Sequence, residues 1–175
     1  ESVINQNYKN FNLIIIDDAS TDNSIEILDK FKSFRGVKFI LNKKRIGHVK
    51  SSNKAIKLAK GKYILRLDAD DYLKKDALKK LVKLIKKNSR VKMVFPNFNW
   101  INSKGKILSK FTYKYKSKYF LNDQPAHGAC SLIDLKFIKK IGGYCKKFDR
   151  QDGFYIWMSI LLNNNEINNL KEKLF

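Results

Sequence analysis

The sequence predicts an α/β fold, with a mostly parallel sheet flanked by helices, in a single domain that spans residues 1–175. Short runs of β-branched and aromatic residues alternate with helical patterns over the first hundred residues. Strand–helix–strand alternation at this spacing is typical of a parallel sheet. The chain has 175 residues and is 43% hydrophobic, which suffices for one core of ordinary domain size.

Four apolar runs are the predicted strands. They are Leu13–Ile16, Val37–Leu41, Tyr63–Leu67 and Val91–Phe95. Between them, apolar residues recur at helical spacing and predict three helices. These helices include Ile25–Phe31, Ala55–Ala59 and Leu78–Ile85.

The pattern changes after Phe95. Residues Asn102–Lys106 have the composition of a hairpin turn. Phe111–Phe120 then alternates aromatic residues with lysines, which predicts a half-buried strand. Two short helices are expected after that, over Asp134–Ile141 and Asp152–Leu162.

Lysine dominates the charge of the chain. Lys and Arg number 37 against 16 Asp and Glu, which gives a formal charge of +21. Such a field attracts nucleic acid, anionic lipid headgroups or a phosphorylated substrate. Only five of these residues are arginines, the type suited to bidentate recognition of bases, so the sequence argues against specific nucleic-acid binding. No apolar run reaches the length of a membrane span, so we expect a cytoplasmic protein with peripheral contact at the inner face of an anionic membrane.

The few acidic residues gather at two predicted strand ends. Asp17-Asp18 follows the first predicted strand, and Asp68-Ala69-Asp70-Asp71 follows the third. Open α/β sheets bind ligands at the carboxyl ends of their strands. Carboxylates gathered there call for a neutralising cation, and hard oxygen ligands suit Mg²⁺ or Mn²⁺, which finish their coordination with water and phosphates. We therefore predict a divalent metal that holds a diphosphate, whereas a single acid such as Asp22 is better explained as a helix cap.

These motifs resemble the family 2 glycosyltransferases, which have the GT-A fold. The matching stretches keep the family's order and spacing; they are Ser2–Tyr8, Phe11–Asp22, Asn42–Gly61, Leu67–Asp71 and, more weakly, Ile141–Tyr144 followed by Gln151–Trp157. The resemblance implies metal-dependent, inverting transfer of a sugar from a nucleotide-sugar to an acceptor hydroxyl, in the synthesis of surface polysaccharide or glycoconjugate. The acceptor would be a saccharide, a lipid-linked molecule or a protein. It also implies a nucleotide-binding part, about residues 1–98, and an acceptor-side part, about residues 99–175.

The resemblance also implies roles for individual residues. Asp18 matches the acid that reads the nucleotide base. Asp68 and Asp70 match the family's D-x-D pair, with Asp70 as the direct metal ligand and Asp68 nearer the ribose and the metal shell. Asp152 matches the general base that takes the proton of the acceptor hydroxyl.

Three departures from the family pattern stand out. Gln151 replaces an acidic residue that usually precedes the base. Ser51-Ser52-Asn53 replaces Ala-Arg-Asn, so Arg45 and Lys50 are the candidates to bind the nucleotide-sugar in place of the missing arginine. The chain also begins inside the family's first helix. We therefore expect a fragment that lacks the first strand, between the strands at Leu13 and Tyr63, and that aggregates or stays molten when expressed alone.

Two other functions remain open from the sequence. A nucleotidyltransferase of similar α/β fold would also bind a metal at strand-end carboxylates. A non-catalytic basic module would use the charge and the lysine-rich helix Lys74–Lys87 to bind nucleic acid or membrane. Metal-dependent binding of a nucleotide-sugar separates the enzymes from the module, and sugar transfer separates the two enzymes. His127 is either a substrate contact or a structural histidine.

Overall fold

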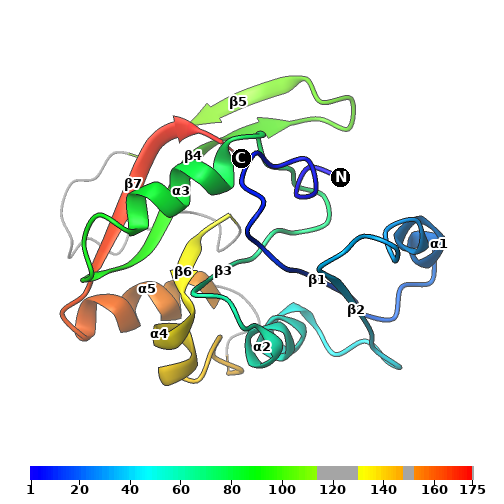
Figure 1. The fold of residues 1–175 in the computed structure, drawn as a ribbon, viewed down its shortest axis with the longest axis horizontal. Coiled ribbons are helices and arrows are strands. Elements are labelled where there is room, and N and C mark those ends of the chain that lie inside the picture. The colour runs from blue at the N-terminus through cyan, green and yellow to red at the C-terminus, as the bar shows by residue number, and fades with distance from the viewer. Residues whose placement is uncertain (114–129, 148–151, 175) are drawn as a thin grey trace.

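The computed structural model describes residues 1–113, 130–147 and 152–174 of the chain. In the first half, strands and helices alternate as predicted (Figure 1): β1 (Leu13–Asp17), α1 (Ser24–Asp29), β2 (Val37–Leu41), α2 (His48–Leu58), β3 (Tyr63–Leu65), α3 (Ala77–Ile85) and β4 (Val91–Ile101). The second half adds β5 (Ile107–Phe111), β6 (Leu132–Asp134), α4 (Leu135–Lys140), α5 (Asp152–Leu162) and β7 (Glu166–Lys173). The predicted α/β architecture is therefore confirmed.

The strands form a two-stranded sheet and a five-stranded sheet. β1 and β2 pair in parallel. In the larger sheet the order is β3-β6-β4-β5, and β7 pairs with β4. Among the described strands, two pairs are parallel and three are antiparallel, so the pairing is mixed where we expected mostly parallel strands. The antiparallel pairs come from the second half, because β5 returns from β4 through the predicted hairpin and β6 enters between β3 and β4.

β1 and β3 are the edge strands at which the two sheets face each other. In Figure 1, β1 lies between β2 and β3. β1 pairs with β2 and β3 pairs with β6, and no ladder of hydrogen bonds joins β1 to β3 among the described residues. Each of these strands therefore has one edge that no described strand covers. This is the position at which the sequence analysis expects a further strand.

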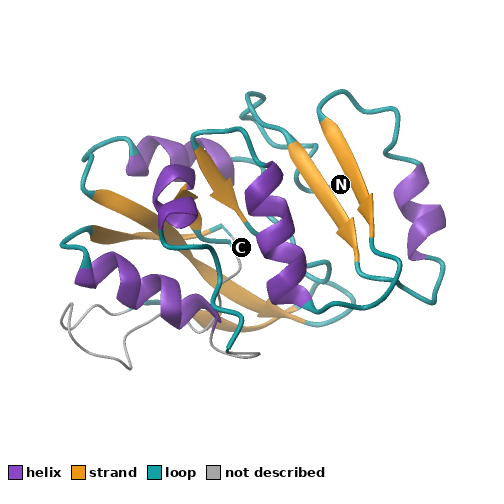
Figure 2. Cartoon of the chain, turned by 90° about the horizontal axis from the view of Figure 1, so that it is seen from below, coloured by secondary structure: helices purple, strands orange, loops and turns teal. Residues whose placement is uncertain are grey.

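Two hydrophobic clusters hold the larger sheet between helices. Residues of α2, α4 and α5 pack on one face with Met93 and Phe95 of β4. Residues of α3 pack on the other face with Val94 of β4 and Leu132 of β6. Figure 2 shows helices on both sides of the strands. This three-layer arrangement follows from β4, whose residues from Met93 to Phe98 are all buried.

β7 is an element that the sequence did not predict. Its sequence, EINNLKEK, has two apolar residues and none of the usual strand pattern. The buried Asn97 of β4 holds it: the Asn97 side chain donates to the Lys171 carbonyl at 2.8 Å and accepts from Asn169 at 3.2 Å. The same side-chain oxygen accepts the Tyr113 N–H at 3.0 Å. This buried polar residue thus holds β7, together with the parallel ladder between β4 and β7.

The remaining predictions of elements are mostly confirmed. α5 covers the predicted range, and α4 begins after Asp134, whose carboxylate accepts the Phe137 N–H at 2.8 Å as an N-cap. β5 begins at Ile107, earlier than the predicted strand at Phe111–Phe120, and residues 114–120 lie outside the described part. Within the described ranges, no helix is long and apolar enough to cross a membrane.

Candidate active site

The carboxylate of Asp18, just after β1, accepts hydrogen bonds from the loop before α2 and from α2 itself. It accepts the N–H groups of Ile46 and Gly47, at 3.1 and 2.8 Å, from the loop before α2. It also accepts from Asn42 Nδ2 at 2.9 Å and Ser51 Oγ at 3.2 Å. An ionised carboxylate offers about four lone-pair directions, so these donors use most of its capacity. Asp18 therefore anchors the loop and the start of α2 to β1.

These contacts act on the charge of Asp18. Burial raises the pKa of this carboxyl, but the hydrogen bonds from Ile46, Asn42, Gly47 and Ser51 together outweigh it and lower the pKa below the ordinary value. The donors stabilise the ionised form. Gly47 has φ +86°, which a glycine adopts without strain. The ionised carboxylate thus fixes the turn into α2.

Arg45 and Lys50 lie on either side of this anchored turn. Arg45 precedes Ile46, whose N–H binds Asp18, and Lys50 is in the first turn of α2. Both residues are exposed. The two cations therefore flank in sequence the turn that Asp18 anchors, and their role in binding a nucleotide-sugar stays a prediction. The role of Asp18 in reading a nucleotide base stays a prediction.

Asp68 and Asp70 follow β3 on the segment that leads to α3. Arg66 pairs with Asp68, with Nε 3.1 Å from Oδ1, and the side chains are 17% and 39% exposed. Asp70 is exposed and makes no hydrogen bond within the described part of the chain. The two carboxylates of the D-x-D pair thus have different surroundings: Asp68 is held by a cation, and Asp70 is open to solvent.

The carboxylates after β3 suit an ion that the protein shares with a substrate better than an ion that protein groups hold alone. Among residues 1–113, 130–147 and 152–174, no group of three or more His, Cys, Asp and Glu side chains is placed to hold a metal ion. Mg²⁺ is often held by one or two carboxylates, with substrate phosphates and water completing its octahedron. Asp68 and Asp70 are two carboxylates of this kind, and a cation that they share with a diphosphate stays a prediction.

Asp152 is the first residue of α5, and its side chain lies outside the described part of the structure. α5 itself is firmly placed, because Ile156, Trp157 and Ile160 lie in the core. Gln151 and His127 also lie outside the described residues. The predicted general base therefore starts a helix that is packed against the large sheet, while its role stays a prediction.

The sequence analysis did not predict the contacts among Asn53, Tyr144 and Arg66. Asn53 of α2 donates to the Tyr144 carbonyl and accepts the Tyr144 N–H, both at 2.8 Å. The guanidinium of Arg66 lies 5.4 Å from the centroid of the Tyr144 ring. A signal was present in the sequence, because Asn53 lies between Val49 and Ile56 on the buried face of α2. A polar residue at such a position must find a buried partner.

The first residues of the chain support the segment that carries the D-x-D pair. The side chain of Gln6 is fully buried; it donates to the Lys74 carbonyl at 2.8 Å and accepts the Leu78 N–H at 3.0 Å. The Ser2 hydroxyl accepts the Leu73 N–H at 3.2 Å. Residues 2–6 thus fix both the approach to α3 and its first turn.

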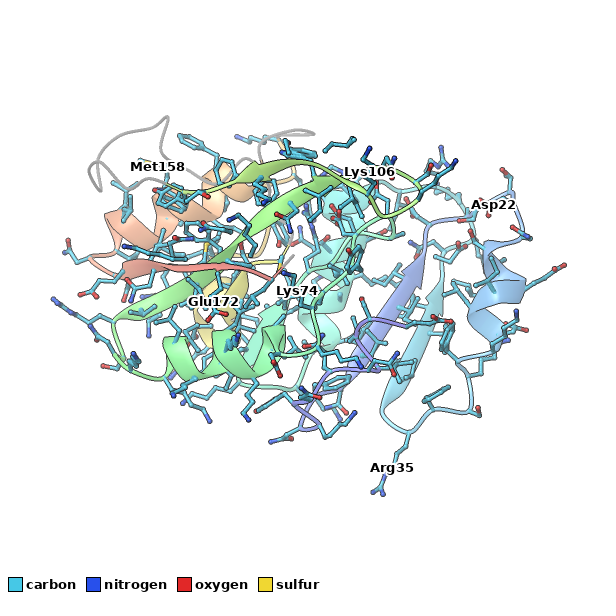
Figure 3. All side chains as sticks on the ribbon, turned by 90° about the horizontal axis from the view of Figure 1, so that it is seen from above. Asp22, Arg35, Lys74, Lys106, Met158 and Glu172 are labelled. Atoms are coloured by element: carbon cyan, nitrogen blue, oxygen red, sulfur yellow. The ribbon has the colours of Figure 1, made fainter. Side chains whose placement is uncertain are left out.

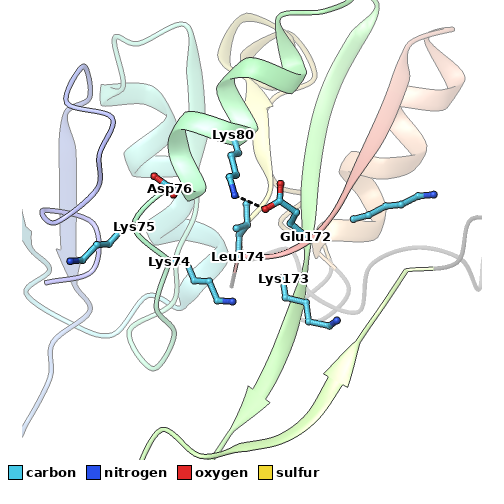
Figure 4. A pocket seen from close by; sticks show the side chains of 8 residues that line it. Lys74, Lys75, Asp76, Lys80, Glu172, Lys173 and Leu174 are labelled. Carbon is cyan, nitrogen blue, oxygen red and sulfur yellow. Dashed lines mark hydrogen bonds and ion pairs between the residues drawn. The ribbon is translucent and has the colours of Figure 1, made fainter.

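An open depression of about 420 Å³ lies elsewhere, between the start of α3 and β7. Figure 4 shows its lysines and the ion pair between Lys80 and Glu172. None of the predicted site residues lines it. In Figure 3, Lys74 and Glu172 of this depression lie near the middle of the molecule, between Asp22 and Arg35 at one end and Met158 at the other. The depression is basic and is separate from the candidate active site.

Comparison with known sequences identifies relatives. The sequence profile of the family described as "Glycosyl transferase family 2" matches residues 1–142. An uncharacterized glycosyltransferase of Methanocaldococcus jannaschii is 30% identical over 99% of this chain and 62% of its own length. The Escherichia coli protein WfgD, a UDP-Glc:alpha-D-GlcNAc-diphosphoundecaprenol beta-1,3-glucosyltransferase, is 29% identical over 94% of this chain and 63% of its own length. The chain therefore spans less than two thirds of these relatives.

Solved structures share the fold. Staphylococcus aureus TarS, residues 1–349 in complex with UDP, superposes with a TM-score of 0.79 at 22% identity, over 99% of this chain and 53% of its own. The mannosyltransferase PcManGT of Pyrobaculum calidifontis, in complex with GDP-Man and Mn²⁺, gives a TM-score of 0.74 at 16% identity, over 97% of this chain and 48% of its own. The arrangement of sheet and helices described above is that of these enzymes.

Proposed function

Because this chain belongs to glycosyl transferase family 2 and has a GT-A-like fold, we propose that it binds a nucleotide-sugar and transfers the sugar to an acceptor hydroxyl with inversion. The reaction would serve the synthesis of surface polysaccharide or glycoconjugate. The named E. coli relative acts on a diphosphoundecaprenol-linked sugar, which favours a saccharide or lipid-linked acceptor. It also favours a location at the inner face of the membrane, where a chain of charge +21 is attracted to anionic lipid.

One observation supports the proposal most strongly. The exposed Asp70 and the Arg66-held Asp68 follow β3, in a chain where cations outnumber anions by more than two to one. Solvent-exposed carboxylates at a strand end are the ligands that a divalent ion shares with a diphosphate. Arg45 and Lys50, which flank in sequence the turn that Asp18 anchors, would bind the phosphates.

The chemistry needs one base and one stabilised leaving group. The acceptor hydroxyl gives its proton to the Asp152 carboxylate while its oxygen bonds to the anomeric carbon. The bond from that carbon to the diphosphate breaks on the opposite side, which inverts the configuration. Asp68 and Asp70 would hold Mg²⁺ or Mn²⁺, which supplies positive charge against the leaving diphosphate.

The family match decides between the functions that the sequence left open. A nucleotidyltransferase would use the same strand-end carboxylates, and a binding module would use the lysines alone. The matched profile and the shared fold favour sugar transfer over both. The lysines around the open depression then belong to the surface of an enzyme.

Binding of nucleotide-sugars in the presence and absence of Mn²⁺ tests the proposal. We expect the full-length protein to bind one member of a panel of UDP- and GDP-sugars only when Mn²⁺ is present. Asp70→Asn removes the charge of the proposed ligand without changing its size, so this binding should fall at least about tenfold, the effect expected for loss of a charge-assisted contact.

A matched control is Asp29→Asn. Asp29 is exposed and pairs with Lys32 on the surface of α1, so this variant should bind the donor like the wild type. Circular dichroism should show the same fold for both variants. Metal-independent binding, or full binding by Asp70→Asn, would contradict the proposed site.

A further inference from the structure

Arg66 connects the D-x-D pair to the second half of the chain. Its guanidinium lies 5.4 Å from the centroid of the Tyr144 ring. On its other side, Nε lies 3.1 Å from Asp68 Oδ1. A guanidinium over an aromatic face within about 6 Å is attracted by the ring. Arg66 is thus held between a buried ring and the first carboxylate of the pair.

The ring that supports Arg66 is itself fixed. Asn53 makes two hydrogen bonds of 2.8 Å with the backbone of Tyr144, and both residues are buried. The neighbouring Gly143 has no room for a side chain, since a Cβ there would lie 2.2 Å from Asn53 Oδ1. Tyr144 therefore cannot shift without loss of two buried hydrogen bonds.

We propose that Asn53 and Tyr144 are positioning residues for the metal and diphosphate site. They hold Arg66, and Arg66 holds the carboxylate of Asp68 where the cation and the donor diphosphate bind. Asp70, which has no such partner among the described residues, keeps its full charge for the metal. The inference rests on the proposed function, and it assigns to the segment after α4 a role in donor binding that its sequence motif does not suggest.

The arrangement resembles the way in which outer groups orient metal ligands in proteins. A carboxylate that is held by a second group loses less freedom when it binds an ion, and removal of the holding group weakens metal affinity. If this proposal is right, the effect of Tyr144 on metal affinity passes through Arg66 to Asp68. A purely structural role of Tyr144 would not depend on Asp68, so this dependence distinguishes the two roles.

The test compares two variants of Tyr144 in the full-length protein. Tyr144→Leu removes the ring and keeps an apolar side chain, whereas Tyr144→Phe keeps the ring. Binding of UDP, with GDP as a second probe, is titrated at several Mn²⁺ concentrations. We expect Tyr144→Leu to weaken Mn²⁺-dependent binding roughly threefold to tenfold, and Tyr144→Phe to stay within about twofold of the wild type. Arg66→Lys keeps the charge but loses the planar group, so it should weaken Mn²⁺-dependent binding as much as Tyr144→Leu does. It replaces Tyr144→Leu in the test if that variant does not fold.

The same titrations in an Asp68→Asn background complete a double-mutant cycle. If Tyr144 acts through Asp68, Tyr144→Leu should have no further effect there. The positioning role would be overturned if Tyr144→Leu and Tyr144→Phe bound UDP in Mn²⁺ with equal affinity and Arg66→Lys bound it like the wild type. That result would leave the proposed function intact. Full Mn²⁺-dependent binding by Asp68→Asn alone would overturn both.

Discussion

At the scale of single residues, Asp18 anchors the loop after β2 and the start of α2. Its carboxylate accepts from two backbone N–H groups and two side chains of the loop and α2. In Asp18→Asn, an NH₂ group would replace one acceptor and face these donors. We expect the free energy of unfolding to fall by about 0.5–1.5 kcal/mol at pH 7, the net contribution of a typical hydrogen bond, because these donors are part-buried or exposed. Urea unfolding measures it, and Asp29→Asn on the surface should change stability by less than about 1 kcal/mol.

The difference between wild type and Asp18→Asn should depend on pH. The hydrogen bonds lower the pKa of Asp18 in the folded protein, so the stabilisation is fully present above the unfolded value of about 3.9. It is lost as pH falls through the folded pKa, because the carboxylate is then protonated. The two unfolding curves should therefore approach each other below about pH 4. A difference that stays constant from pH 7 to pH 3 would show that the charge of Asp18 is not what holds the loop.

Gly142 and Gly143 provide a matched pair for the contact with Asn53. Both have φ +84°, but a Cβ at Gly142 would meet nothing within 4 Å, whereas one at Gly143 would lie 2.2 Å from Asn53 Oδ1. Alanine at either position should lower the free energy of unfolding by roughly 1 kcal/mol, because its side chain disfavours a positive φ. Gly143→Ala must also disrupt the Asn53 hydrogen bonds, so we expect it to cost about 2 kcal/mol or more beyond Gly142→Ala. Equal thermal stability of the two variants would contradict the packing of Tyr144 on α2.

The sequence supplied the acids of the proposed site but not the contacts that surround them. Asp18, Asp68 and Asp70 were predictable because each follows an apolar strand in the chain. The bonds between Asn53 and Tyr144 join residues 91 positions apart, and no local pattern reports such a contact. The sequence analysis gave Arg66 no role, because only the fold places its guanidinium 5.4 Å from the centroid of the Tyr144 ring.

At the scale of elements, β1, β2 and α1 contribute a single buried residue to the fold. α1 has no buried residue, and β1 has only Asp17. Both hydrophobic clusters take their buried residues from outside these three elements. We therefore expect the amides of β1 and β2 to exchange with solvent much faster than those of β4, which are protected by pairing and burial. Native-state hydrogen exchange measures this, and equal protection would show that the strands are covered on their free edge.

Elements were predictable where a local pattern existed. The strand and helix patterns of the first half and the helices at Asp134 and Asp152 were found in the structure. β7 was missed because its Asn- and Lys-rich sequence has no strand pattern, and its position depends on the buried Asn97 of a distant strand. The antiparallel placement of β6 also follows from tertiary pairing with β3 and β4, which short-range periodicity does not encode.

At the scale of the whole molecule, the proposed reaction requires both halves of the chain. The acids and cations that would bind the donor lie in the first half, on the segments after β1 and β3. The proposed base, Asp152, begins α5 in the second half, and α5 packs in the same cluster as Asn53's helix α2 and Tyr144. Donor binding and proton removal should therefore be separable by mutation.

The most direct measurement is sugar transfer by the wild type and Asp152→Asn, with donor binding measured on the same samples. We expect the wild type to release nucleoside diphosphate and form a glycosylated acceptor in Mn²⁺. Asp152→Asn should bind the donor with unchanged affinity while transfer falls by about 10²–10⁴-fold, as expected for loss of a general base. A variant that keeps full transfer, or a wild type that binds nucleotide-sugar but releases pyrophosphate instead of transferring the sugar, would contradict the account.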